Sequence, residues 1–413
     1  MKNYKHRDDC RLCGATCLEL VMPILPSPIG DAFVSKDKLT EAQELFPLDT
    51  YFCLECSHVQ NLDVVNPNIL FRDYTYKTSA SLGLVDHFQK YAEEVIGALN
   101  IPRDSLVVEM GSNDGSLLKA FKNKGMLVLG IDPAVNIANT ASIEGVTTIP
   151  EFFSSHLAKK ILVETGSAQL FCANNVFAHI DDIADIVHGV RTVLDQHGTF
   201  VFEVSYLPDM VDKFVFDTIY HEHVSHHSLI PLERFFNTLD MTLFHVERIP
   251  TKGGSIRGFA QPLSTGVRAK TPSLNNLMDI EKKRGFNRPE IYHKFFKNIE
   301  KRKRETLEFI NNAICNKKTV SAYGASTTAT TLLYHFEFEN LVSFIYDDNP
   351  IKHSLYSPGA HIPVLPSEKI YEKKPDIIII LAWQYAEIII KKHKEYIESG
   401  GCFLAPLPYL KIN

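Results

Sequence analysis

The sequence has no surplus of positive charge and no long apolar run, and each absence excludes a class of protein. Its 413 residues carry a formal net charge of −6, so we expect no nucleic-acid partner and no anionic membrane surface. The longest apolar run near the end covers residues 377–383, far short of the ~20 residues that span a membrane. Residues 1–9 are polar and charged and lack a secretory apolar core. We therefore expect a cytoplasmic protein.

What the sequence does contain is typical of a globular protein with several domains. Hydrophobic residues make up 45% and charged residues 22%, and the length suits two or three domains of ~100–200 residues each. We expect a monomer or a weak dimer. Eight cysteines in a reducing compartment favour metal ligands over disulfides.

Four of these cysteines form two C-x-x-C pairs, Cys10 with Cys13 and Cys53 with Cys56. Each pair can present two thiolates from one turn, so together they suit a tetrahedral zinc site. A redox C-x-x-C motif and unrelated buried thiols are the alternatives. Because four thiolates leave no open coordination position, we expect structural zinc without a catalytic role.

A strand, a glycine-bearing turn and a helix follow one another in the middle of the chain. Residues 106–110 predict a buried strand, 111–115 the turn and 116–122 the helix. This arrangement can cradle a nucleotide. A second strand over 126–131 ends at Asp132, where a carboxylate can accept hydrogen bonds from ribose hydroxyls.

The glycines of this turn depart from the dinucleotide fingerprint G-x-G-x-x-G. They read Glu-x-Gly-x-x-x-Gly from Glu109 to Gly115, which resembles motif I of the Rossmann-like S-adenosylmethionine (SAM) methyltransferases. Asn113 and Asp114 would oppose a pyrophosphate at the helix start. We therefore favour SAM over NAD as the cofactor. The residues expected to bind it in this region are Glu109, Gly111, Asn113, Gly115 and Asp132.

Two later segments add side chains to the expected site. Phe152 follows the next apolar turn, where an aromatic ring can stack on adenine or belong to the core. A strand near residues 170–174 is followed by a loop that bears Asn174, Asn175 and His179. Open α/β sheets bind ligands at the carboxyl ends of their strands, so we expect these polar groups at the site.

The densest group of titratable side chains lies at residues 218–228, which we name the histidine stretch. It holds four imidazoles, with Tyr220 and Glu222 among them. Histidine exchanges protons near neutral pH, and a tyrosine can donate a hydrogen bond to an oxyanion. We expect a proton-transfer site; a metal site and ordinary surface histidines are the alternatives. A hydroxyl-rich segment with Tyr74 and Tyr76 could line the same pocket or cap a helix.

The C-terminal half holds two more glycine-bearing turns. The first contains Ser255 and Arg257 and could hold a substrate hydroxyl or phosphate, or form a hairpin. The second follows a strand at 319–323 and opens a helix, so its amides could bind the pyrophosphate of a nucleotide sugar or of NAD. The residues assigned to this second nucleotide site are Gly324, Ala325, Ser326 and Asp347.

The order of these motifs resembles the sugar-nucleotide C-methyltransferases that act on 4-keto deoxysugars, nearly from end to end. The carrying motifs are the two cysteine pairs and residues 109–115, 174–179, 220–223 and 253–255. The resemblance implies an α/β fold with a small zinc-binding module at 1–70, followed by two Rossmann-like doubly wound α/β domains. The first, at 71–250, would bind SAM, and the second, at 251–413, would bind a dTDP- or GDP-linked sugar.

The resemblance also implies roles for individual side chains. His223 would be the base at C3 of the sugar, and the pocket would be completed by Tyr220, Glu222, His179 and one of Tyr74 or Tyr76. The chemistry agrees, because a ketone at C4 acidifies the C3 hydrogen and hydrogen-bond donors can stabilise the resulting enolate. An NAD-dependent sugar reductase or epimerase, or a non-catalytic zinc-bearing binding module, would be the alternatives.

Overall fold

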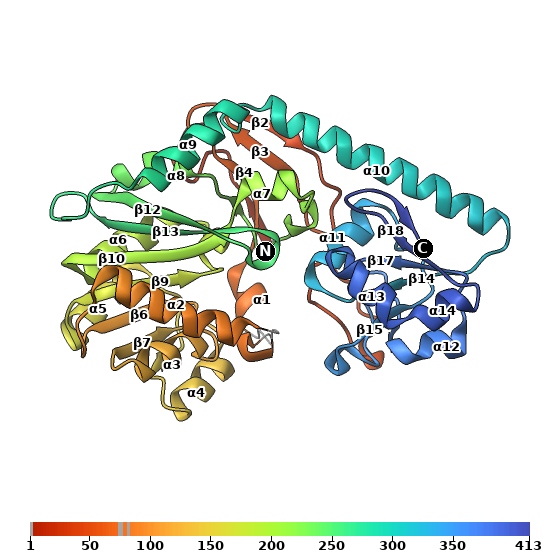
Figure 1. Ribbon diagram of the computed structural model, residues 1–413, viewed down its shortest axis with the longest axis horizontal. Coiled ribbons are helices and arrows are strands. Elements are labelled where there is room, and N and C mark those ends of the chain that lie inside the picture. Colours follow the sequence, from red (N-terminus) through yellow and green to blue (C-terminus); the bar gives the residue numbers. More distant parts are fainter. Residues whose placement is uncertain (1–2, 73–76, 81–82) are drawn as a thin grey trace.

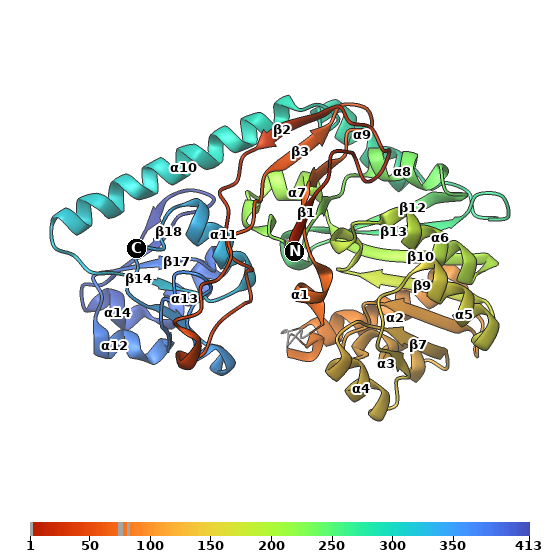
Figure 2. The ribbon, with the colours of Figure 1, turned by 180° about the vertical axis from the view of Figure 1, so that it is seen from behind.

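The structure, a computed structural model, describes residues 3–72, 77–80 and 83–413, so Tyr74 and Tyr76 lie outside the described residues. Two α/β bodies lie side by side, and the long helix α10 (Glu290–Cys315) runs along the C-terminal one from the top of the molecule (Figure 1). Strands of the N-terminal module lie between the two bodies (Figure 2). The expected architecture of one small module and two Rossmann-like domains is confirmed.

The N-terminal module is built on a four-stranded antiparallel sheet, and one of its strands comes from the histidine stretch. β11 (Ser225–His226) pairs with β4 (Val59–Asn61), which continues through β3 (Thr50–Cys53) to β2 (Leu18–Met22). The histidine stretch is therefore physically part of this sheet. The remaining elements of the module are β1 (Tyr4–His6), η1 (Lys36–Lys38), β5 (Asp63–Val65), α1 (Pro67–Phe71) and η2 (Thr78–Ala80).

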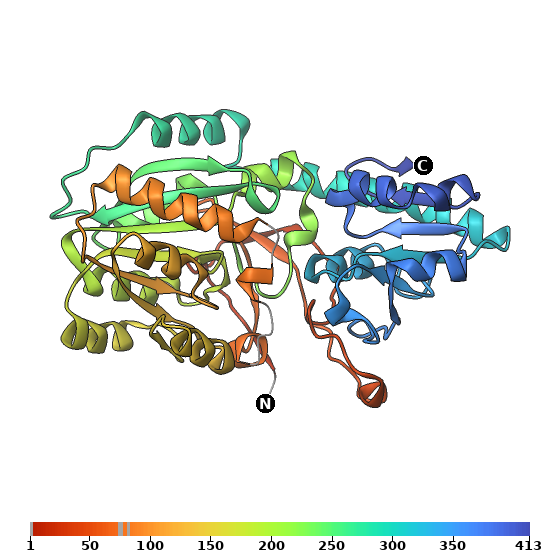
Figure 3. The same ribbon diagram turned by 60° about the horizontal axis from the view of Figure 1, so that its bottom comes forward.

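The chain between β2 and β3 leaves the module and crosses to the C-terminal body. The backbones of Val34 and Tyr356 exchange hydrogen bonds of 3.1 and 2.9 Å, and Lys352 forms an ion pair with Asp31. Figure 3 shows this red segment beside the blue C-terminal body. The N-terminal module is thus one continuous segment of sequence that contacts both the histidine stretch and the C-terminal body.

The middle body, within the described residues, is a seven-stranded sheet of order β12-β13-β10-β9-β6-β7-β8. Strands β10 through β8 are parallel, and their apolar side chains are buried because helices cover the sheet. The elements, in chain order, are α2 (Leu84–Leu99), β6 (Leu106–Met110), α3 (Ser116–Asn123), β7 (Leu127–Ile131), α4 (Val135–Ile143), β8 (Thr148–Ile149), α5 (Ser155–Thr165), β9 (Ala168–Asn174), η3 (Phe177–His179), α6 (Ile183–Val193), β10 (Leu194–Ser205), α7 (Leu207–Asp212), η4 (Phe216–Thr218), α8 (Leu229–Asn237), β12 (Met241–Ile249), η5 (Thr251–Gly253) and β13 (Ser255–Pro262).

The sheet of the middle body continues past residue 250, and the domain boundary expected there stays a prediction. β13 pairs antiparallel with both β10 and β12, so the body reaches at least residue 262. Helix α9 (Pro272–Arg284) then packs on β12 and α8. The charged segment from residue 280 onward forms the end of α9 and, after a turn, α10.

The C-terminal body is a six-stranded sheet of order β16-β15-β14-β17-β18-β19, parallel except for the last strand. Its elements are β14 (Val320–Tyr323), α11 (Thr327–His335), β15 (Ile345–Asp347), η6 (Pro350–Lys352), β16 (Val364–Pro366), η7 (Ser367–Lys369), α12 (Ile370–Lys373), β17 (Ile377–Ile380), η8 (Trp383–Tyr385), α13 (Ala386–Lys392), α14 (Lys394–Glu398), β18 (Cys402–Ala405) and β19 (Lys411–Ile412). None of the helices formed by the described residues combines the length and apolar character needed to cross a bilayer.

Candidate active site

One cavity of about 1230 Å³ connects the middle body, the histidine stretch and the C-terminal body. Its lining begins at the turn after β6, passes the loop after β9 and the start of the histidine stretch, and ends at the turns after β14 and β17. Each of these turns follows the carboxyl end of a parallel strand, which is where open α/β sheets bind ligands. Both nucleotide cradles expected from the sequence therefore open into the same space.

The turn after β6 has the conformation that its glycines predict. Gly111 has φ of 68°, and a Cβ there would lie 2.2 Å from the Val176 side chain, so only glycine fits. Its N–H donates to the Ile131 carbonyl over 2.7 Å. Gly115, with φ of 74°, opens α3 against Val146 and does not line the cavity. Gly111 is thus at the site, whereas Gly115 supports the turn.

Asp132 ties this turn to the end of β7. Its carboxylate accepts the N–H groups of Asn113 and Ala134, each at 2.9 Å. Burial raises the pKa of Asp132. The side chain of Asn113 in turn accepts the Thr78 N–H over 2.9 Å, which brings the segment before α2 to the cavity. Each carboxylate oxygen has a second lone pair, so Asp132 can still accept from a ribose hydroxyl.

The donor set around this half of the cavity fits SAM. Asn174 is buried, and neither polar atom of its side chain is hydrogen-bonded within the described part of the chain; a ligand with both donors and acceptors would satisfy them. Phe152 lines the cavity, and the guanidinium carbon of Arg72 lies 5.1 Å from the centre of its ring. The ring therefore offers a flat aromatic surface to the adenine of SAM. Glu109 also lines the cavity. Burial raises its pKa well above its usual range, which favours the protonated, uncharged carboxyl group.

Three of the four imidazoles in the histidine stretch are core residues. Burial lowers the pKa of His221 to about 4 and that of His227 to about 3. The pKa of His226 is also well below its usual value because that ring is buried, and its Nε2 lies 2.9 Å from Asn61 Oδ1. The density of histidines in the sequence therefore overstated the number at the site: His223 alone of the four lines the cavity.

His223 is held in one orientation by contacts on both ring nitrogens. Its Nδ1–H donates to the Thr218 carbonyl over 2.8 Å, which leaves Nε2 as the basic nitrogen of the neutral ring. The Tyr220 hydroxyl lies 3.1 Å from that Nε2. The ring of His179 is 5.1 Å from the ring of His223 and stacks on Phe71 at 5.6 Å. Glu222 also lines the cavity. The expected cluster is thus brought together, with the Tyr74 and Tyr76 predictions untested.

The C-terminal body contributes the turns after β14, β15 and β17. Ala325, Ser326 and Asp347 line the cavity, but Gly324 does not. A Cβ at Gly324 would lie 2.6 Å from the Ala382 side chain, so this glycine allows close packing of two loops. The Ala325 N–H donates to Asp347 over 2.6 Å, and is therefore engaged by a carboxylate, contrary to our expectation of an open amide.

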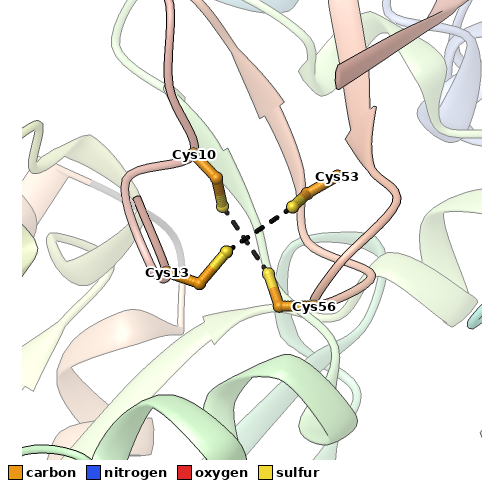
Figure 4. A group of neighbouring side chains, drawn as sticks. All are labelled: Cys10, Cys13, Cys53 and Cys56. Carbon is orange, nitrogen blue, oxygen red and sulfur yellow. Dashed lines mark hydrogen bonds between the residues drawn. The ribbon is translucent and has the colours of Figure 1, made fainter. Parts of the chain in front are cut away.

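The four cysteines expected to bind zinc converge from two loops (Figure 4). All four sulfur atoms lie within 4.8 Å of one another; Cys10 and Cys56 are 3.6 Å apart, as are Cys13 and Cys53. Tetrahedral zinc with Zn–S bonds of ~2.3 Å places its sulfurs ~3.8 Å apart, so the donor set fits. Two nearby residues that could also ligate zinc are not in the cluster: Cys17 is exposed and His58 contacts Ser225.

Two predicted substrate ligands lie away from the cavity. Arg257 is on β13, fully buried, and pairs with Glu203 at 2.8 Å and Glu94 at 2.9 Å above the Tyr91 ring. Ser255 is buried on the same strand and bonds the Thr251 carbonyl. Neither residue lines the cavity, because the glycine-rich turn is a hairpin between β12 and β13, the alternative that the sequence left open.

Several cavity residues escaped sequence reasoning. They are Thr78, Asp181, Asp217, Lys352, Trp383 and Tyr385. Trp383 and Tyr385 follow the carboxyl end of β17, so the strand-end rule could have identified them. Asp217 immediately precedes the histidine stretch. Lys352 and Asp181 carried no such signal.

The fold and the site define a Rossmann-type SAM methyltransferase with a cysteine-bound zinc module. Three family models match the chain in order: a zinc binding domain at residues 10–71, a methyltransferase domain at 85–246 and a C-methyltransferase C-terminal domain at 250–408. The curated relative C-methyltransferase NovU of Streptomyces niveus is 32% identical over 406 residues, covering 97% of this chain and 96% of that protein. The chain therefore belongs to the family of C-methyltransferases that carry an N-terminal zinc-binding domain. It is a SAM-dependent C-methyltransferase with structural zinc.

Solved structures resemble part of the chain. SAM-bound magnesium protoporphyrin IX methyltransferase from Synechocystis PCC 6803 is 15% identical and covers 43% of this chain and 80% of its own, with a TM-score of 0.32. The PH0226 protein from Pyrococcus horikoshii OT3 is 14% identical and covers 48% of this chain and 98% of its own, with a TM-score of 0.38.

Proposed function

We propose that the enzyme methylates C3 of a nucleotide-linked 4-keto-6-deoxy sugar, with His223 as the base. The carrying observation is the geometry of His223, whose Nδ1–H is fixed by the Thr218 carbonyl while Nε2 meets Tyr220. This ring stands in a cavity that reaches both nucleotide cradles. A base between a methyl donor and a sugar is what carbon methylation next to a ketone requires.

The proposed step begins with a carbon that becomes nucleophilic only after losing a proton. His223 Nε2 takes the C3 hydrogen as a proton, and the C–H electron pair spreads onto the C4 oxygen. We assign His179 and Tyr220 as the hydrogen-bond donors to that oxygen. SAM, when bound, supplies an electrophilic methyl group for the new carbon–carbon bond. The residues of this chain need only hold the two reactants in line and exclude water.

The nucleotide end of the substrate is assigned to the C-terminal body. Asp347 is already fixed by the Ala325 and Asn349 amides, so it suits ribose hydroxyls better than phosphate. Ser326 at the start of α11 and the cation of Lys352 line the same part of the cavity, and they suit a diphosphate. We assign the linked nucleotide to dTDP or GDP and expect the enzyme to act as a monomer or weak dimer.

The relative NovU supports carbon as the methyl acceptor, since it is named a C-methyltransferase. The alternative is an NAD-dependent reductase or epimerase. Addition of NADH to the purified protein would produce protein-bound nicotinamide fluorescence only under that alternative.

The deciding experiment is deuterium exchange at C3. A dTDP- or GDP-linked 4-keto-6-deoxyhexose, incubated in D₂O with enzyme and S-adenosylhomocysteine, should take up deuterium at C3. With SAM it should be methylated, whereas the 4-hydroxy sugar should give neither result. His223→Ala should bind S-adenosylhomocysteine normally and lose exchange by ~10²–10⁴-fold. His156→Ala removes an exposed imidazole outside the cavity and should exchange at the normal rate. Full exchange by His223→Ala would refute the assignment.

A further inference from the structure

Arg11 lies inside the first cysteine pair, yet its side chain reaches the active-site backbone. It sits between Cys10 and Cys13, and its side chain has 0% exposure. A buried guanidinium is costly unless its donors find acceptors; both Nη atoms of Arg11 do, whereas Nε has no acceptor among the described residues. The acceptors around Arg11 therefore show what this residue holds.

Three of these acceptors lie in the histidine stretch or on the neighbouring strand β4. Nη1 donates to the Val224 carbonyl and to Gln60 Oε1, the latter over 3.0 Å. Nη2 donates to the Asn61 carbonyl over 2.7 Å. Since Val224 directly follows His223, the guanidinium fixes the backbone one residue beyond the proposed base.

The backbone of the same residue, Val224, is also tied to the segment of His179, the second imidazole proposed for catalysis. The Val224 N–H donates to the Ala178 carbonyl over 3.0 Å, and Ala178 directly precedes His179. Nη2 of Arg11 also lies 3.6 Å from the Asp181 carboxylate, two residues beyond His179. Arg11 thus stands between the two segments whose rings are 5.1 Å apart in the cavity.

We propose that Arg11 is a positioning residue, through which the N-terminal zinc-binding module sets the orientation of the His223 ring and the distance between the rings of His223 and His179. The proposal goes beyond a scaffolding role for the N-terminal module and rests on the proposed role of His223 as base. The planar guanidinium group explains why position 11 is an arginine. A lysine ammonium cannot bond Val224, Gln60 and Asn61 with the same fixed geometry.

The chain offers a matched control in Arg7. Arg7 also pairs with Asp181, at 3.0 Å, and with Asp9 at 2.9 Å, but no contact with Val224 is found for it among the described residues. Arg11→Lys and Arg7→Lys therefore both keep the charge, and the first alone removes the guanidinium from the histidine stretch.

The first readout needs no substrate. In protein with ¹⁵N-labelled histidine rings, His223, assigned by its loss in His223→Ala, should give the signal of the neutral ring protonated at Nδ1. Arg11→Lys should shift this signal toward the other tautomer, with zinc content and S-adenosylhomocysteine affinity unchanged, whereas Arg7→Lys should leave it in place. An unchanged His223 signal in folded Arg11→Lys protein would overturn the proposal.

The second readout is kinetic. With a dTDP-linked 4-keto-6-deoxyhexose and SAM, Arg11→Lys should lower kcat on the order of 10–100-fold and change either KM little, since misplacement of a reacting group by ~1 Å has that effect. A fall in thermal stability with unchanged kcat would mean a structural role only. If Arg11→Lys fails to fold, Gln60→Met removes one acceptor that steers the guanidinium and should lower kcat in the same direction. Absence of turnover in the wild type would count against the proposed function, while the ring signals would still decide the role of Arg11.

Discussion

The indole Nε1–H of Trp383 donates to the carboxylate of Asp217 over 3.0 Å, joining the C-terminal body to the segment that precedes the histidine stretch. The next residue, Thr218, provides the carbonyl that holds His223 Nδ1. A second bond runs from the Thr331 hydroxyl on α11 to the Ile219 carbonyl, at 2.9 Å. The segment that bears His223 is therefore held from one side by the C-terminal body and from the other by the N-terminal sheet.

Asp217 should make stability depend on pH in a defined direction. Burial raises its pKa from 3.8 to about 7, so the folded protein holds this proton more tightly than the unfolded chain. Its contribution to the free energy of unfolding is fully present below pH ~4 and is lost as the pH rises through 7, by ~4 kcal/mol at most. Asp217→Asn keeps an acceptor for Trp383 and should remove this loss. Urea unfolding at pH 4, 6 and 8 measures it.

The buried Glu281 supplies an independent comparison for that experiment. Burial raises its pKa from 4.5 to about 7, and its carboxylate accepts from Leu229, Ile230 and Tyr206. Glu281→Gln should remove its own share of the pH dependence and leave that of Asp217. A profile for Asp217→Asn parallel to that of the wild type would show that the Asp217 carboxyl carries no such penalty.

Loss of one zinc ligand should unfold the N-terminal module. Cys53→Ser leaves three thiolates of the cluster, so purified protein should contain much less than one zinc per chain. The free energy of unfolding should fall by several kcal/mol, because metal binding and folding are coupled in such sites. Cys17→Ser is the matched control, since Cys17 is exposed and outside the cluster. Equal zinc content in the two variants, by atomic emission, would contradict the four-cysteine site.

Most of the fold follows from the order and period of the apolar runs. The strand at 106–110 has the expected bounds, and the helix at 116–122 and the strand at 126–131 agree with the structure to within one residue, because each is a short segment closed by a turn residue. The cysteine pairs and the Gly111 turn were predictable because metal geometry and a positive φ each demand a particular residue type. Neighbouring residues were sufficient to predict these features because each depends only on contacts within a short segment or on one residue type.

The errors arose where distant partners decide the outcome. The sequence places four histidines together, but burial by Phe46, Asn61 and Phe177 makes three of them structural. Likewise, a cation beside glycines resembles a phosphate ligand until Glu203 and Glu94 are seen to neutralise Arg257. No spacing rule shows which segments a chain will bring together across 50 residues or more.

Arg257 should therefore affect stability and not substrate binding. Arg257→Met leaves Glu203 buried without its cation, which typically costs ~3–5 kcal/mol. The free energy of unfolding should fall accordingly, while KM for the nucleotide sugar at a temperature where the variant is folded stays within about twofold. Lys352→Met gives the contrast, since Lys352 lines the cavity and its loss should raise that KM without altering SAM affinity. A large rise in KM for Arg257→Met would restore it as a substrate ligand.

Tyr220 should matter for chemistry more than for structure. Tyr220→Phe keeps the ring, which lies 4.2 Å from that of His223, and removes the hydroxyl that meets Nε2. We expect kcat to fall by ~10–100-fold, because a positioned hydrogen-bonding group in proton transfer contributes at least that much, while S-adenosylhomocysteine affinity stays unchanged. Tyr206→Phe is the matched control: it removes a buried hydroxyl that bonds Glu281 at 2.8 Å, so it should lower stability by about 1 kcal/mol and leave kcat intact. Equal kcat losses in the two variants would mean that Tyr220 acts through the fold alone.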